Sequence, residues 1–336
     1  MTTYKEAGVD VEAGDEAVDR IRPMVRETFT DGVLEDIGAF GSFFELDLGD
    51  LDRPVLVSSI DGVGTKVKVA ARAERYDSVG QDLVNHCVND VAMCGARPLY
   101  FLDYVGTGTL DPSVAEEIVG GFAAACKENG CALVGGEMAE MPDVYREGDF
   151  DLVGTVVGVV DKSKIVNGTE IEPGDVLLGL PSTGIHTNGY TLARTVLFDA
   201  YDLGDRPEAL GGETVEDALL RVHRSYLQAV QALVQQGLAR GLVHVTGGGL
   251  PGNLARVLPD GCSAVVDYDS WTRPPLFDLI QREGDVPEAD MRTTFNLGIG
   301  LVVVVRPEDE DDARAVLGEL DETPSRIGTV SDTAST

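Results

Sequence analysis

Positively charged residues are scarce in this sequence. Its 336 residues include 26 Lys and Arg against 58 Asp and Glu, which gives a formal net charge of −32. A field of that sign repels nucleic acids and anionic membrane surfaces, so we expect neither as a partner. It also repels phosphorylated substrates, so any phosphate site must be locally positive or assisted by a metal ion. We interpret the excess of acid as an adaptation to high salt inside the cell, where screening shortens the reach of self-repulsion. A specific basic partner is the alternative.

Long apolar runs and paired cysteines are also missing. No stretch approaches the ~20 apolar residues needed to cross a bilayer, and residues 1–6 show no apolar signal region, so export is not expected. The five cysteines include no C-x-x-C pair, which is typical of reduced thiols packed as small hydrophobic groups. These absences predict a globular cytoplasmic protein, and the length suits two domains.

Strands and helices alternate along most of the chain, which predicts an α/β fold class. In the first half we expect helices at 15–29, 79–94 and 112–129, and strands at 42–48, 54–60, 98–105, 131–135 and 150–160. A polar segment containing Asn167-Gly168 and Pro173-Gly174 then indicates a domain crossing. We therefore predict domains at 1–166 and 167–336. In the second we expect strands at 176–180, 242–245, 263–267 and 297–305, and helices from 190, at 214–236 and at 308–320.

The most informative segment reads Asp61-Gly62-Val63-Gly64-Thr65-Lys66 and follows an apolar strand. Gly62 and Gly64 allow positive φ, so that backbone N–H groups can face an anion. Asp61 offers oxygen ligands to Mg²⁺, and Lys66 offers a positive charge to phosphate. The segment is neither a Walker loop nor a G-x-G-x-x-G loop. A tight turn with a solvated lysine explains the same residues, so both interpretations stay open here.

Asn89 and Asp90 lie on the helix expected at 79–94. Asn85 and Asn89 are four residues apart and therefore share a helix face. Their apolar neighbours indicate a buried helix, where polar groups need partners. A metal and phosphate face is one interpretation, and a solvent-exposed stripe is the other.

A third acidic segment follows another expected strand. Gly135-Gly136-Glu137 repeats the order of glycines and carboxylate, and Glu137 with Asp61 and Asp90 would suit a divalent ion shared with a nucleotide. Asp103 lies in an apolar strand and needs a partner there. A structural hydrogen bond to a loop is the simpler role for Asp103.

The second half contains a loop that suits phosphate. His186-Thr187-Asn188 follows a strand and opens a helix, whose first N–H groups and hydroxyls can hold an anion. His186 can donate to phosphate or transfer a proton. A loop histidine without a role is the alternative. We expect His223 in a helix and His244 in a strand.

A glycine pattern in the second half resembles a dinucleotide-binding fingerprint. Gly247-x-Gly249-x-x-Gly252 follows a strand, and Asp267 ends the next one. Pro251 interrupts this loop, and the following helix is too short for a parallel crossover. The pattern is weak support for a nicotinamide cofactor.

Read together and in order, the motifs resemble one family, the phosphoribosylformylglycinamidine cyclo-ligases, also called AIR synthetases. The resemblance runs through residues 4–10, 61–66, 87–90, 101–104, 133–142, 186–190, 246–249 and 294–296. It implies a homodimer whose N-terminal sheets join in a barrel, with a C-terminal α/β domain on each subunit. It also implies the reaction, in which ATP and formylglycinamidine ribonucleotide give 5-aminoimidazole ribonucleotide, ADP and phosphate.

The resemblance also implies roles for individual residues. Asp61, Asp90 and Glu137 resemble Mg²⁺ ligands, and His186, Asp61 and Lys66 resemble catalytic residues. The nucleotide side would comprise Asp61, Gly62, Gly64, Thr65, Lys66, Asn89, Asp90, Gly135, Gly136 and Glu137. The substrate side would comprise His186, Thr187, Asn188, Gly247, Gly248 and Gly249. One departure is Met138, which stands where the family usually has threonine and removes a hydroxyl beside Glu137.

Other functions fit parts of the sequence. A related ATP-dependent phosphoryl-transfer enzyme of the same superfamily would share the Asp61 segment. A non-catalytic nucleotide-binding dimer would bind ATP without turnover. A nicotinamide-dependent oxidoreductase rests only on the Gly247 loop.

Overall fold

The computed structural model describes residues 3–49 and 51–333, which divide into two compact units. The first unit runs to Val91 and resumes from Pro98 to Val159. The second holds Ala92–Arg97 and the chain from Val160 onward, so it includes a short segment from the first half. Each unit contains helices and its own sheet, which confirms the mixed α/β class.

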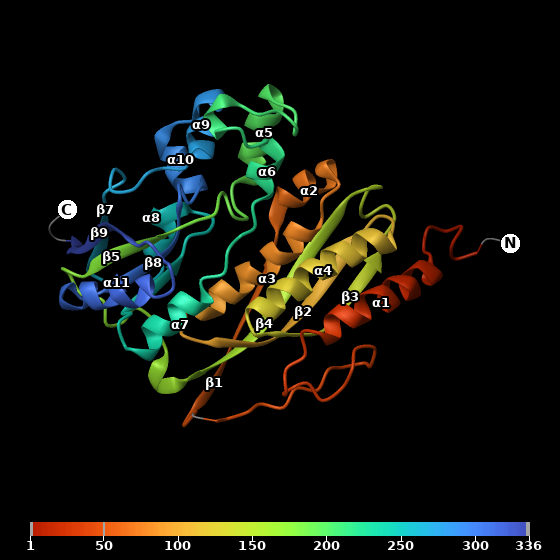
Figure 1. Ribbon diagram of the computed structural model, residues 1–336, viewed down its shortest axis with the longest axis horizontal. Helices are drawn as coiled ribbons and strands as arrows, with labels where there is room; N and C mark the ends of the chain where they lie inside the picture. The colour runs from red at the N-terminus through yellow and green to blue at the C-terminus, as the bar shows by residue number, and fades with distance from the viewer. Residues whose placement is uncertain (1–2, 50, 334–336) are drawn as a thin grey trace. The chain divides into compact units, whose positions relative to one another are not determined.

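The first unit is built on a four-stranded sheet in the order β1-β4-β2-β3. The strands are β1 (Pro54–Gly62), β2 (Arg97–Thr107), β3 (Ala132–Glu140) and β4 (Phe150–Asp161). The helices are α1 (Val11–Arg26), α2 (Val67–Ala73), α3 (Asp77–Ala92) and α4 (Pro112–Glu128). Helices α3 and α4 lie over the sheet, and α1 packs on α4 and β3 (Figure 1). The edge strands β1 and β3 are therefore separated by two other strands.

Local sequence explains where α4 begins. The Asp111 side chain accepts a hydrogen bond from the Ser113 N–H at 2.8 Å, and Pro112 occupies the first turn, where no intrahelical N–H bond is lost. Phe101 of β2 and Phe122 of α4 are fully buried and contact each other with ring centroids 6.3 Å apart. This core fixes the helix layer against the sheet.

The second unit contains a five-stranded antiparallel sheet in the order β6-β8-β5-β9-β7. The strands are β5 (Val176–Pro181), β6 (Gly241–His244), β7 (Cys262–Val266), β8 (Ile299–Val305) and β9 (Ser325–Asp332). The helices are α5 (Tyr190–Ala200), α6 (Val215–Leu220), α7 (Leu227–Gln235), α8 (Gly249–Leu254), α9 (Pro275–Gly284), α10 (Glu288–Thr294) and α11 (Glu310–Gly318). Leu177 of β5, Val302 of β8 and Ile327 of β9 belong to one hydrophobic core cluster. Leu250 of α8 packs into the same cluster.

Two expected elements are wrong. The long helix at 214–236 is two helices, α6 and α7, because Arg221 leaves the helical conformation with φ −52° and ψ 130°. The intervening segment turns His223 and Tyr226 into the core, where both are buried. The strand at 42–48 is a single bridge between Val33 and Phe44.

The dinucleotide-binding interpretation also fails. Strands β6 and β7, which flank the Gly247 loop, lie at opposite edges of an antiparallel sheet and cannot form the parallel unit that such a site needs.

The cysteine prediction is confirmed, since all five thiols are free and three of them are buried. In the part of the chain that the structure describes, every helix is too short or too polar to span a bilayer.

Candidate functional site

The Asp61 segment forms the end of β1 and a short turn. Asp61 and Gly62 are the last residues of the strand, and a 3₁₀ turn spans Gly64–Lys66. Gly64 has φ +66°, as the sequence predicts, whereas Gly62 keeps an extended strand conformation. Thr65 is half-buried in the same turn. The segment therefore changes direction sharply just after the Asp61 carboxylate.

Lys66 is buried rather than solvated. Its side chain is 0% exposed, and its Nζ lies 2.7 Å from Oδ2 of Asp82, which is also 0% exposed and lies on α3. Burial lowers the pKa of Lys66, and the negative charge of Asp82 opposes this effect. The ion pair ties the turn to α3. A direct contact between this ammonium and phosphate stays a prediction.

Helix α3 brings further polar groups to the end of β1. The Asp61 Oδ1 lies 3.6 Å from Nε2 of His86, and Ser59 Oγ donates to Oδ2 of Asp90 at 3.0 Å. Burial, with the nearby charges of Asp61 and Asp90, raises the pKa of the Cys87 thiol well above its usual value. This end of β1 therefore combines two carboxylates that are only partly exposed.

The predicted helix face of amides is buried. Asn89 is 0% exposed, and Asn85 accepts a hydrogen bond from Nδ2 of Asn129 at 2.8 Å. Asn129 follows the end of α4, so Asn85 joins the two helices. Both amides are buried, which excludes the solvent-exposed stripe.

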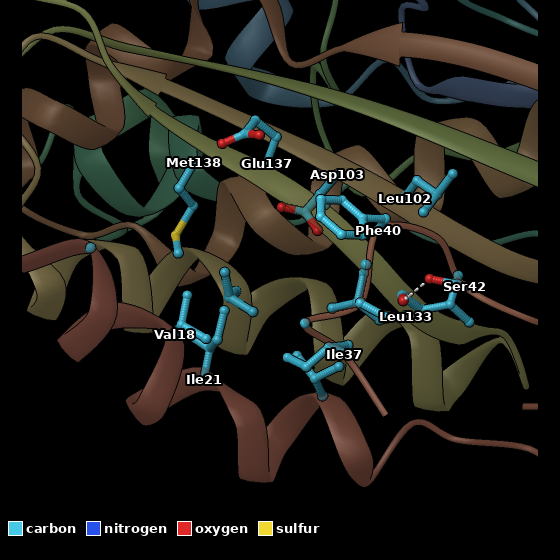
Figure 2. Close-up of a pocket in the computed structure, with 18 of the residues that line it drawn as sticks. Val18, Ile21, Ile37, Phe40, Ser42, Leu102, Asp103, Leu133, Glu137 and Met138 are labelled. Atoms are coloured by element: carbon cyan, nitrogen blue, oxygen red, sulfur yellow. Dashed lines mark hydrogen bonds between the residues drawn. The ribbon is translucent and has the colours of Figure 1, made fainter. Parts of the chain in front are cut away.

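Glu137 lies beside a cavity of about 950 Å³ that is lined by α1, residues 37–44, β2 and β3. Gly135, Gly136, Glu137 and Asp103 all line this cavity. Figure 2 shows the Asp103 carboxylate beside the Phe40 ring, with Val18 and Ile21 of α1 across the space. The cavity therefore has largely apolar walls, and its five acids are Asp103 and Glu137 together with Asp10, Asp15 and Glu140.

Asp103 is a titratable group in this cavity. Burial raises its pKa to about 7, and the charge of Glu137 adds to this effect, while a hydrogen bond from its own backbone opposes it. A Cβ on Gly136 would lie 2.2 Å from Oδ1 of Asp103, so only glycine leaves room for this carboxylate. Asp103 thus packs over β3 and bonds to its own backbone, whereas the sequence suggested a hydrogen bond to a neighbouring loop.

The predicted metal ligands are not assembled within one chain. Asp61 lies at the end of β1, and Glu137 lies on β3, at the opposite edge of the sheet. Neighbouring strands lie about 4.8 Å apart, so the two intervening strands separate these carboxylates by more than about 10 Å. The oxygen ligands of Mg²⁺ must each lie about 2 Å from the ion, so these two carboxylates of one chain cannot bind the same ion. Asp61 and Asp90 lie together; Glu137 does not join them in the same subunit.

The predicted substrate loops meet in the second unit. Asn188 Oδ1 lies 3.2 Å from where a Cβ of Gly247 would stand, so the His186–Asn188 loop contacts the glycine loop before α8. His186 is 1% exposed, has φ +65°, and accepts a hydrogen bond from the Thr183 N–H through Nε2 at 3.3 Å. A non-glycine residue in this strained conformation is common at functional sites. Gly248 and Gly249 also have positive φ, at +96° and +60°.

His223 and His244 belong to the same region, although the sequence assigned them no role. The His186 and His223 rings stack with centroids 4.0 Å apart, and His223 Nε2 lies 3.0 Å from His244 Nε2. The signal that could have found them is the scarcity of histidine, with only four in the chain. The predicted continuous helix at 214–236 concealed His223.

Comparisons with family models and with known proteins identify the same family that the sequence motifs resemble. The N-terminal domain of AIR synthase related proteins matches residues 47–160, and the C-terminal domain of the same family matches residues 172–336. A phosphoribosylformylglycinamidine cyclo-ligase from Anaeromyxobacter sp. (strain K) is 52% identical over 94% of this chain and 91% of its own length. The enzyme of the same name from Myxococcus xanthus is 50% identical over 94% of this chain and 92% of its own length.

Solved structures share the fold at lower identity. A thiamine-monophosphate kinase from Stenotrophomonas maltophilia superposes with a TM-score of 0.70 at 22% identity, covering 94% of this chain and 93% of that one. The hydrogenase maturation protein HypE, determined in complex with ATP, superposes with a TM-score of 0.66 at 19% identity, covering 96% and 87%.

Proposed function

The chain belongs to the AIR synthase related protein family, and we propose on this basis that it converts formylglycinamidine ribonucleotide to 5-aminoimidazole ribonucleotide, with ATP giving ADP and phosphate. The observation that carries the proposal is about 50% identity over nearly the whole length of enzymes with this named activity. The conjunction of the Asp61, Glu137 and His186 segments in one chain supports it.

The chemistry explains why ATP is needed. An amide oxygen is a poor leaving group, and its carbon is a poor electrophile. Phosphorylation of the formyl oxygen corrects both, after which the neighbouring nitrogen attacks that carbon and phosphate leaves. Both reacting groups lie on one substrate, so an enzyme that holds both ends reduces the entropic cost of closing the ring.

We assign Mg²⁺–ATP to the first unit. Asp61 and Asp90 supply the carboxylate oxygens that Mg²⁺ prefers, and the turn at Gly64 and Thr65 offers N–H groups beside them. When bound, the ion would neutralise phosphate charge that the acidic protein otherwise repels. The cavity beside Gly135 and Glu137 has the size and apolar walls typical of a site for a nucleotide base.

A homodimer would unite these two halves of the site. Strand β1 is a sheet edge that carries Leu56 and Ile60, which are 62% and 65% exposed and point to the same face. An edge strand with exposed apolar residues is normally covered in a folded protein. We propose that the sheets of two subunits join, so that Glu137 of one chain completes the metal and nucleotide site around Asp61 and Asp90 of the other.

The substrate belongs to the second unit in this proposal. His186, Thr187 and Asn188 with the loop Gly247, Gly248 and Gly249 would hold the ribonucleotide phosphate and the formyl group. His186 would neutralise charge or move a proton during ring closure, and Lys66 would hold the turn that presents Asp61.

The test is an assay with formylglycinamidine ribonucleotide, ATP and Mg²⁺ at high KCl. We expect aminoimidazole ribonucleotide and ADP in equal amounts, loss of product for Asp61→Asn, and unchanged rates for Asp311→Asn, an exposed acid on α11. ATP binding by folded protein without any product would favour the non-catalytic alternative and overturn the proposal.

A further inference from the structure

Three of the four histidines form one buried cluster in the second unit. His186, His223 and His244 are 1%, 0% and 6% exposed. His223 connects the other two, since its ring stacks on His186 and its Nε2 lies 3.0 Å from Nε2 of His244. Its other nitrogen, Nδ1, lies 3.3 Å from Oγ1 of Thr187. His223 therefore has both ring nitrogens committed to neighbours in or beside the proposed substrate loop.

The contact between the two Nε2 atoms restricts where protons can lie. A hydrogen bond at this distance needs one donor and one acceptor, so a single proton lies between the rings. Two protonated Nε2 atoms would repel each other, and two unprotonated ones would leave buried acceptors facing each other. The protonation states of the two Nε2 atoms are therefore opposite, so that one carries a proton and the other does not.

Which of the two Nε2 atoms carries the proton also determines the hydrogen bond between His223 and Thr187. If His223 donates through Nε2, its neutral ring accepts at Nδ1, and the Thr187 hydroxyl donates to it. If His244 donates instead, Nδ1 of the neutral His223 ring carries the proton, and Thr187 Oγ1 accepts. Asn188 Nδ2 also donates to this oxygen, at 3.4 Å. In the second arrangement the Thr187 proton must be directed to a partner other than His223.

We propose that His223 and His244 act as a pair of positioning residues that sets the direction of the Thr187 hydroxyl and, through ring stacking, the position of His186. The inference rests on the proposed function in one respect, namely that the loop containing Thr187 holds the substrate. The pair transfers no proton to the substrate. It determines whether the loop presents Thr187 as a donor or as an acceptor.

The first test needs no activity. Nitrogen-15 NMR of histidine-labelled protein reports which ring nitrogens carry protons, and four residues are readily assigned from single substitutions such as His86→Gln. We expect one of the His223 and His244 Nε2 atoms to be protonated and the other not. Substituting His244→Phe should change the tautomer or the tautomer ratio of His223. Two Nε2 atoms in the same state, or a His223 signal unaffected by His244→Phe, would overturn the proposal.

The second test separates the two contacts of His223. The amide nitrogen of His223→Asn can replace Nδ1 and keep the Thr187 contact, whereas His223→Gln replaces Nε2 and keeps only the His244 contact. We expect His223→Gln, which loses the Thr187 contact, to raise the KM for formylglycinamidine ribonucleotide about tenfold, the loss of one buried hydrogen bond. His223→Asn keeps that contact but loses the His244 contact that sets its direction, so we expect it to raise the KM by a smaller factor of about threefold. A KM that is unchanged in either variant would contradict the proposal.

Controls keep this test decisive if a histidine variant fails to fold. Thr187→Val removes the hydroxyl at nearly constant volume, should also raise KM about tenfold, and should add nothing to His223→Gln in a double variant. Additive effects would overturn the coupling between these residues. Wild-type protein without turnover would refute the proposed function alone, because the NMR result does not depend on it.

Discussion

Lys66 shows at the residue scale how burial changes the role of a side chain. The sequence places it after a glycine turn, where a mobile ammonium would serve phosphate. The structure instead pairs it with Asp82 in an environment without solvent exposure. A single sequence could not predict this pair, because Asp82 lies in another helix and becomes its neighbour only through packing.

Breaking this ion pair should destabilise the protein strongly. Lys66→Met leaves the Asp82 charge buried without its partner, and we expect a loss of about 3–5 kcal/mol in the free energy of unfolding. The matched control is Lys127→Met, which removes the exposed pair with Glu27 and should cost less than about 1 kcal/mol. Urea unfolding measures both. Equal losses in the two variants would contradict the structural role of Lys66.

Asp103 should make stability depend on pH. Its folded pKa of about 7 lies above the value near 3.8 of an unperturbed aspartate, so the folded state holds a proton that the unfolded state releases. The stabilisation relative to Asp103→Asn is complete below about pH 4 and is lost as the pH rises through about 7. Because the side chain is half-buried, we expect a loss of about 2 kcal/mol across this range. Denaturation of both proteins at several pH values gives the difference, and parallel curves would refute the assignment.

Secondary structure elements decide which residues meet. Alternating apolar patterns predicted the strands at 54–60, 98–105 and 150–160 to within a few residues of β1, β2 and β4. The end of α6 was not predictable, because the chain leaves the helix to bury His223 and Tyr226, and this gain comes from tertiary packing rather than from local propensity. Likewise, the order of strands in the sheet, which separates Asp61 from Glu137, depends on contacts that no local pattern records.

Gly300 on strand β8 packs closely against the histidine cluster, so a substitution there tests this packing. A Cβ at Gly300 would lie 2.1 Å from Oη of Tyr226 and 2.6 Å from Cε1 of His186. We expect Gly300→Ala to cost about 1–3 kcal/mol and to reduce turnover, because both side chains must move. Gly318→Ala at the end of α11 meets no atom within 4 Å and should be neutral or slightly stabilising. Thermal melting and the product assay compare them, and a neutral Gly300→Ala would exclude this close packing.

The whole molecule carries a charge of −32, which should make its stability depend on salt. Added KCl screens repulsion among surface acids, so we expect the Tm to rise between low salt and about 0.5 M KCl. Sucrose at matched osmolality is the control and should raise the Tm less. A Tm independent of KCl would contradict the interpretation of the acidic surface as a salt adaptation.

If two subunits share each cyclo-ligase site, a heterodimer of complementary variants keeps one intact site. Asp61→Asn and Glu137→Gln proteins, each purified alone, should lack activity. A heterodimer of the two variants, isolated through different tags after co-expression, would contain one site with both substitutions and one with neither. We therefore predict that it forms aminoimidazole ribonucleotide at about half the wild-type rate per dimer. A heterodimer as inactive as its parents would contradict the shared site.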